Sequence, residues 1–173
     1  MEESVFPSSS SVLELPATSS PSLLSNSPLF LAWAAFAIGQ SFKFFILWYK
    51  ERRFDAKLLI GSGGMPSSHS ATVTALAVSI GLQEGFDGSL FAVAAVLASV
   101  VMYDAFGVRL HAGRQAEVLN QIVFELPAEH PLSDTRPLRE LLGHTPPQVF
   151  AGSMLGLAIA LVGYAISKSV IVG

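Results

Sequence analysis

The chain has 173 residues, of which 51% are hydrophobic and 13% charged, and its formal net charge is −3. A soluble domain of this length seldom combines such a composition with a positive mean hydropathy, so a membrane protein is the better class. The lack of cysteine excludes disulfides, thiolate metal sites and cysteine nucleophiles. The small net charge and the absence of any DNA or RNA motif argue against a nucleic-acid partner.

The first 28 residues are rich in Ser and Pro and contain no Lys or Arg. A transit peptide or a secretory signal would carry basic residues, whereas this segment carries Glu2, Glu3 and Glu14. We therefore expect a disordered tail over residues 1–28, followed by one membrane domain over residues 29–173.

Four apolar stretches follow the tail, and each of them predicts a membrane helix. They are Leu29–Tyr49, Ser70–Leu82, Leu90–Val108 and Val149–Val172. A spanning helix needs about 20 residues, so the second stretch is short. It counts only if its helix starts back at Ser67, near a thinned or protein-lined interface. We expect an all-α polytopic bundle of about four transmembrane helices, with a tight polar turn at Gln83–Gly88.

The basic residues gather on one side of this predicted bundle. An even number of spans puts both termini on one side, and the loops between spans 1–2 and 3–4 on the other. These two loops carry Lys50, Arg52, Arg53, Lys57, Arg109, Arg114, Arg136 and Arg139. The positive-inside rule then makes the loop side cytoplasmic. No address for an organelle is recognisable, so the endoplasmic reticulum is the default location. These charges could be topology signals alone, but that explanation does not account for Lys43, which lies inside a span.

Lys43 is the first candidate for a functional residue. A lysine within a span usually faces a polar cavity, although near a helix end it can extend to the interface. Lys43 and Lys50 are two helical turns apart, so both amines project from one face. Two cations on one face suit an anion better than they suit lipid.

The segment "GGMPSSHS" at residues 63–70 stands where the second apolar helix begins. Gly63 and Gly64 let the backbone approach a ligand closely, and Ser67 or Ser68 can cap the helix. The amino end of a helix is a natural place for a phosphate, and His69 in the first turn would face it. Taken alone, the segment favours a serine cap with an interfacial histidine.

The segment "LRELLGHTPPQVFAG" at residues 138–152 repeats this arrangement before the last span. Thr145 is expected as the N-cap and Pro146 as the first helical residue, so His144 lies at the mouth of the helix. The predicted topology puts His144 and His69 on the same membrane face. Two histidines, two helix amino ends and several cations at one interface make a phosphate-handling site plausible from the residues alone.

These segments resemble the motifs of the type 2 phosphatidic acid phosphatase superfamily, which includes the vanadium-dependent haloperoxidases. The closest resemblance is to its divergent branch of acid phosphatase/haloperoxidase-related membrane proteins. The first superfamily motif is Lys-(six residues)-Arg-Pro, and "KFFILWYK" matches it with Lys43, with Lys50 in the arginine position and no proline. The second is Pro-Ser-Gly-His, and "PSSH" matches it with His69, with Ser68 in the glycine position.

The third motif is Ser-Arg-(five residues)-His-(three residues)-Asp. Here "LRELLGHTPPQ" supplies Arg139 and His144, with the gap between them one residue short and Gln148 in place of the aspartate. The resemblance covers most of the chain from about Leu29 onward. The second and third segments together are specific, whereas the lysine motif alone is not.

The resemblance implies a helical phosphatase/haloperoxidase-like core, without a metal or another cofactor. It implies that His144 attacks phosphorus and forms a phosphohistidine, and that His69 protonates the leaving oxygen. The residues implied to hold the phosphoryl group are Lys43, Lys50, Ser68 and Arg139. Because the pocket would open at the edge of the bilayer, the expected substrate is a lipid or isoprenoid phosphate or diphosphate.

Gln148 leaves two interpretations open. As the residue that orients the nucleophile, its amide can accept a hydrogen bond from an imidazole N–H and fix the tautomer, but it cannot stabilise an imidazolium as a carboxylate would. The stretch Thr145-Pro-Pro-Gln148 also matches the pattern of a helix capping box. Lys50 in an arginine position would also weaken bidentate phosphate recognition.

The superfamily motifs leave the segment Met102–Gln121 unexplained. Asp104 falls inside the third predicted span, and Arg109 and Arg114 follow it as possible accessory residues. Asp104 could pair with Lys43, orient a histidine in place of the missing carboxylate, or assist a divalent ion. A simple Asp–Lys or Asp–Arg pair that fixes helix packing is the other interpretation.

Two alternatives to a phosphatase stay open. The first is a non-catalytic protein that keeps the pocket to bind a phosphate-bearing lipid. The second is a metal site on Asp104, His69 and His144, for which no tight ligand spacing such as His-Glu-x-x-His is present. The remaining histidines, His111 and His130, are expected to be solvated loop residues.

Overall fold

The computed structural model describes residues 26–51 and 64–172, and within these ranges the chain forms helices, turns and irregular segments but no strand. The helices are α1 (Ser27–Glu51), α3 (Ser68–Glu84), α4 (Ser89–Phe106), α5 (Val108–Phe124) and α6 (Pro146–Val172). The expected helical membrane bundle is confirmed. Most of the predicted N-terminal tail lies outside the described residues, as do the basic residues Arg52, Arg53 and Lys57.

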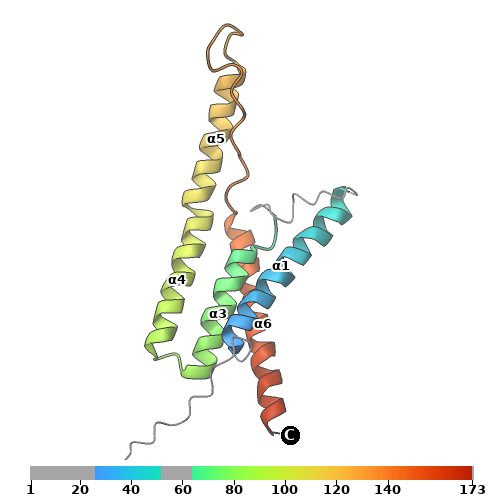
Figure 1. The fold of residues 1–173 in the computed structure, drawn as a ribbon, viewed down its shortest axis with the longest axis vertical. Helices are drawn as coiled ribbons and strands as arrows, with labels where there is room; N and C mark the ends of the chain where they lie inside the picture. Colours follow the sequence, from blue (N-terminus) through green and yellow to red (C-terminus); the bar gives the residue numbers. More distant parts are fainter. Residues whose placement is uncertain (1–25, 52–63, 173) are drawn as a thin grey trace, which may run out of the picture.

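Helix α3 lies at the centre of the bundle and contacts α1, α4 and α6 (Figure 1). Its small residues Ala71 and Ala75 are fully buried against Ala35 of α1, and Leu155 and Ile159 of α6 pack on the same cluster. Lipid chains are as apolar as a helix surface, so small residues that let backbones approach closely supply much of the packing. This explains why the core of the bundle is built from alanine.

The contact between α3 and α6 depends on two glycines spaced by one turn. A methyl group on Gly152 would lie 2.2 Å from the Ser67 carbonyl oxygen, and one on Gly156 would lie 2.3 Å from the Ala71 oxygen. Both distances are far below van der Waals contact, so the two backbones touch here. The Ser67 N–H also donates to the Gln148 carbonyl, 3.1 Å away. Helix α6 therefore holds the amino end of α3 directly.

Three segments are long and apolar enough to cross a membrane: Ser27–Ile46, Ser89–Phe124 and Pro146–Ser169. Helix α3 has 17 residues and rises only about 25 Å, less than the hydrocarbon core of about 30 Å. It begins at the position expected from the sequence, because Ser67 is its N-cap and accepts from the Ser70 N–H at 3.3 Å. Its surroundings are helices rather than lipid, which fits the protein-lined interface expected for it.

Helix α5 was not expected. The sequence suggested a loop after Val108, but the chain bends at Gly107 and continues as a helix to Phe124 (Figure 1). The segment after it runs back beside α5 toward α6, and residues 127–137 form an exposed loop. Hydropathy conceals α5 because only its Gly113 and Ala116 are buried, while most of its other side chains are exposed.

The start of α1 and the end of α6 lie at the same end of the bundle in Figure 1. There the Gln83 side chain donates to Ser27 Oγ, which joins the end of α3 to the start of α1. The segments that lead into α3 and α6 lie at the opposite end. The predicted two-sided arrangement is therefore present, while its orientation relative to the cytoplasm stays a prediction.

Candidate functional site

Lys43 is buried in the bundle, with 2% of its surface exposed. Its Nζ donates to Ser68 Oγ at 3.3 Å, so the amine points to the start of α3 and does not extend to the interface. Two glycines lie beside this contact. A methyl on Gly39 of α1 would lie 3.2 Å from the Ser68 Cα, and Gly64, at φ +95°, lies over the aliphatic part of Lys43.

The serines of the second motif divide into two kinds. Ser67 and Ser70 are structural, because Ser67 caps α3 and Ser70 Oγ donates to Ser67 Oγ at 2.9 Å. Ser68 is also fully buried, and its hydroxyl oxygen accepts from Lys43. A buried lysine is costly without hydrogen-bond partners, so Ser68 is the residue of this segment that holds the charge in place.

His144 is 3% exposed, and the break between α4 and α5 fixes its backbone. Its N–H donates to the Ala105 carbonyl at 3.0 Å. In an unbroken helix that carbonyl would accept from the Arg109 N–H, four residues on. The preceding residue, Gly143, also packs closely on α5, since a methyl on it would lie 2.3 Å from the Leu110 nitrogen. The bend at Gly107 thus frees the acceptor that anchors His144.

The imidazole of His144 is buried with one nitrogen that no described residue satisfies. Its Nε2 is buried and has no hydrogen-bond partner in the part of the chain that the structure describes. Burial, followed by the positive charges of Lys43, His69 and Arg109, lowers the pKa of His144 to about 4. The ring is therefore neutral at physiological pH, with a lone pair on one of its two nitrogens.

His69 lies in the first turn of α3, and its surface is exposed. Its ring packs edge-on against Phe36 of α1, with 6.2 Å between the ring centroids. The charges that act on His144 thus come from three helices: Lys43 from α1, His69 from α3 and Arg109 from α5. The structure brings the two histidines to one end of the bundle, as their positions in the sequence predicted.

Asp104 forms an ion pair with Arg109, whose Nε donates to Asp104 Oδ2. Of the pairings considered from the sequence, the Asp–Arg pair is the one observed, and Lys43 bonds to Ser68 instead. From the sequence, Arg109 was expected only as a possible accessory residue. Its position beside His144 depends on the helix break at Gly107, for which the glycine after an apolar run was the only signal.

The other predicted residues lie apart from this cluster or act elsewhere. Arg139 is exposed on the segment beside α5, and Arg114 is exposed on α5 itself. Gln148 Oε1 accepts from the Thr145 N–H at 2.9 Å, which is the capping-box contact. Lys50 lies in the last turn of α1, and its side chain is outside the described part of the structure.

Among the residues of the two described ranges, no group of three His, Asp or Glu side chains could hold a metal ion. The alternative metal site on Asp104, His69 and His144 is not formed, since Asp104 pairs with Arg109.

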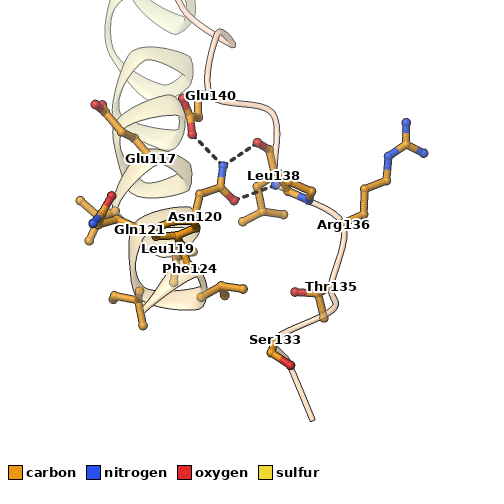
Figure 2. Close-up of a pocket in the computed structure, with 14 residues that line it drawn as sticks. Glu117, Leu119, Asn120, Gln121, Phe124, Ser133, Thr135, Arg136, Leu138 and Glu140 are labelled. Atoms are coloured by element: carbon orange, nitrogen blue, oxygen red, sulfur yellow. Dashed lines mark hydrogen bonds between the residues drawn. The ribbon is translucent and has the colours of Figure 1, made fainter. Parts of the chain in front are cut away.

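A pocket elsewhere lies between the far half of α5 and the returning segment (Figure 2). It is held by Asn120, whose amide bonds to both the N–H and the carbonyl of Leu138 and to Glu140. None of the predicted site residues lines this pocket.

Comparisons with known proteins give the chain a family. A model described as the Divergent PAP2 family matches residues 24–159, which include α1, α3, α4, α5 and half of α6. The chain is also 43% identical over 150 residues to the uncharacterized membrane protein YuiD of Bacillus subtilis (strain 168). That similarity covers 81% of this chain and 95% of the bacterial protein. No solved structure matches the chain.

Proposed function

Since the chain belongs to the Divergent PAP2 family, we propose that it is a membrane phosphatase that hydrolyses a lipid or isoprenoid phosphate or diphosphate. The observation that carries the proposal is His144, buried beside the charge of Lys43 with an Nε2 that no described residue satisfies. A buried nitrogen without a partner is costly in a structural role and useful in a nucleophile.

The reaction has two steps. In the first, the Nε2 lone pair of His144 attacks phosphorus, the bond to the leaving oxygen breaks, and His69 gives that oxygen its proton. In the second, water attacks the phosphohistidine while His69 takes a proton from it, the P–N bond electrons return to Nε2, and inorganic phosphate leaves. Lys43 and Ser68 hold non-bridging oxygens during both steps, because phosphoryl transfer depends mainly on positioning and charge stabilisation.

The surroundings of His69 support a substrate with a hydrophobic tail. If His69 protonates the leaving oxygen, the leaving group must lie on the side of His69. On that side stands Phe36 of α1, and Trp33 packs against Phe36 edge-on with 63% of its own surface exposed. These aromatic side chains extend from the histidine along the lipid-facing side of α1, which suits a prenyl or acyl chain.

The test is phosphate release from phosphatidate and from prenyl diphosphates by the purified protein in detergent, with a chelator present. We expect release that orthovanadate inhibits and that His144→Ala abolishes. His111→Ala is the matched control, because His111 is an exposed histidine of α5. If a folded wild-type protein releases no phosphate from any of these substrates, or if His144→Ala keeps the activity, the phosphatase is excluded.

One observation favours a second candidate, a non-catalytic protein that binds a phosphate-bearing lipid at the same site. The position of the superfamily aspartate is Gln148, whose side-chain oxygen is taken up by the Thr145 N–H. Gln148→Asp separates the two candidates. A faster rate in this variant would mean that the missing carboxylate limits catalysis. Binding of phosphatidate vesicles without release by either protein would favour the second candidate.

A further inference from the structure

The arginine that the superfamily pattern supplies, Arg139, does not lie at the site. Its neighbours Leu138 and Glu140 are tied to Asn120 of α5, eleven residues beyond Arg109. Along a helix that separation is about 16 Å. The exposed Arg139 is thus displaced along α5 from the point where His144 is anchored.

Arg109, by contrast, lies close to the point where His144 is anchored. It stands in the first turn of α5, and the carbonyl of Ala105, one turn earlier, accepts from the His144 N–H at 3.0 Å. The backbone of Gly143 packs against Arg109 and Leu110 themselves, since a methyl there would lie within 2.7 Å of both. Arg109 is therefore adjacent to the nucleophile through contacts of the main chain.

The guanidinium of Arg109 is held on one side and free on the other. Its Nε donates to Asp104 Oδ2, while its two terminal nitrogens make no hydrogen bond within the described ranges. The arginine side chain is 54% exposed, so these nitrogens remain accessible. A planar fork of donors, oriented by a carboxylate behind it, matches two oxygens of a phosphate.

We propose that Arg109 is the phosphate-binding arginine of this site in place of Arg139, and that Asp104 is the positioning residue for its guanidinium. This assignment rests on the proposed function, because it names the group that binds the phosphoryl oxygens opposite Lys43. The electrostatics agree with it: the charge of Arg109 acts on the ring of His144. The arginine that the third motif calls for is thus supplied by Arg109, which the bend at Gly107 brings in from outside the motif.

The test compares Arg109→Gln, Arg109→Lys and Arg139→Gln, with Arg136→Gln as a control that removes the same charge from the exposed loop. For Arg109→Gln we expect kcat/KM to fall and the vanadate inhibition constant to rise, each roughly ten- to a hundredfold. Arg109→Lys should recover part of this loss, and Arg136→Gln should stay within about twofold of the wild type. A loss in Arg139→Gln together with an unaffected Arg109→Gln would overturn the assignment.

The positioning role of Asp104 is tested with a measurement that a purely structural role would not change. Asp104→Asn should raise the vanadate inhibition constant less than Arg109→Gln does. In a protein that already carries Arg109→Gln it should add nothing, because the two residues act as one unit. Effects that multiply would show that Asp104 does not act through Arg109.

The outcome can be separated from failure of the phosphatase itself. If the wild type releases no phosphate, the measurement becomes the rise in unfolding temperature that orthovanadate or inorganic phosphate gives to each variant. Stabilisation that disappears in Arg109→Gln and persists in Arg136→Gln supports the assignment without any catalysis. Stabilisation that persists in Arg109→Gln, or its absence in the wild type, contradicts it.

Discussion

Among single residues, the contrast between His144 and His69 is the most informative. One ring is buried with a nitrogen that no described residue satisfies, and the other is exposed and packs against Phe36. A nucleophile must be unprotonated and shielded from water, whereas a general acid must reach the leaving group and exchange its proton. Under the proposed function, the buried ring of His144 is the nucleophile and the exposed ring of His69 is the general acid.

The charge of Lys43 can be tested through the pKa of His144. In histidine-labelled protein studied by NMR, with the signal identified by its loss in His144→Gln, we expect a titration midpoint near 4 instead of 6.5. Charges face this ring from Lys43 of α1, His69 of α3 and Arg109 of α5. Lys43→Met should therefore raise the midpoint, because it removes a cation that disfavours the imidazolium. A midpoint that falls or does not move in this variant would contradict the arrangement.

The same shift gives a pH dependence of stability. A histidine whose pKa is lowered in the folded state binds fewer protons there than in the unfolded state between pH 4 and 6.5. The contribution of His144 to the free energy of unfolding is thus fully present above about pH 6.5 and is lost as the pH falls to 4. We expect the unfolding temperature in detergent to drop across this window, and to drop less in His144→Gln.

At the level of secondary-structure elements, the break between α4 and α5 links the shape of a helix to the site. Gly107 allows the bend, and the bend releases the Ala105 carbonyl for the His144 N–H. A methyl on Gly107 would lie 2.7 Å from the Tyr103 oxygen, so the bend in this form requires glycine.

Gly107→Ala should therefore weaken the anchor of His144 without unfolding the bundle. We expect the amide of His144 to exchange its hydrogen faster, as measured by mass spectrometry, and phosphate release to fall about tenfold. Gly88→Ala is the control, because a methyl there would be 3.6 Å from its nearest neighbour, the Gly85 carbonyl oxygen. Equal exchange at His144 in both variants would exclude this role for the bend.

The contact between α3 and α6 predicts a loss of stability. In Gly156→Ala the new methyl would overlap the Ala71 carbonyl oxygen at 2.3 Å, so the helices must separate. We expect a loss of about 1–3 kcal/mol in the free energy of unfolding, measured by denaturant titration in mixed micelles. Ala158→Val, at an exposed position of the same helix, should change it by less than about 0.5 kcal/mol. Equal losses in the two variants would mean that backbone contact does not determine the packing.

These elements show how far the sequence could be interpreted. The starts of α3 and α6 were predictable, because Ser67, Thr145 and Pro146 are local signals whose effect does not depend on the rest of the fold. Helix α5 and the role proposed for Arg109 were not predictable. Both follow from contacts between backbone groups that are distant in sequence, such as those of Ala105 and His144. Local patterns carry no record of such contacts, so they indicate Arg139, the arginine nearest the third motif in sequence.

For the molecule as a whole, the start of α1 and the end of α6 lie at one end of the bundle, and the start of α6 lies at the other (Figure 1). The lack of cysteine makes the arrangement simple to test with single introduced thiols. We expect Glu129→Cys and Ser169→Cys to react with a membrane-impermeant maleimide from opposite sides, with Glu129→Cys on the cytoplasmic side. Labelling of both positions from one side would be incompatible with the bundle.

The segment Ser89–Phe124 has 36 residues, which at about 1.5 Å each gives a length near 54 Å. A hydrocarbon layer of about 30 Å cannot enclose it. Its first residues are fixed by the short turn after α3, so we expect the surplus to project into water on the side of His144. A fluorophore or an affinity handle attached near His130 would consequently stand clear of the detergent belt. The protein could then be immobilised by this projection, with its lipid-facing helices left untouched.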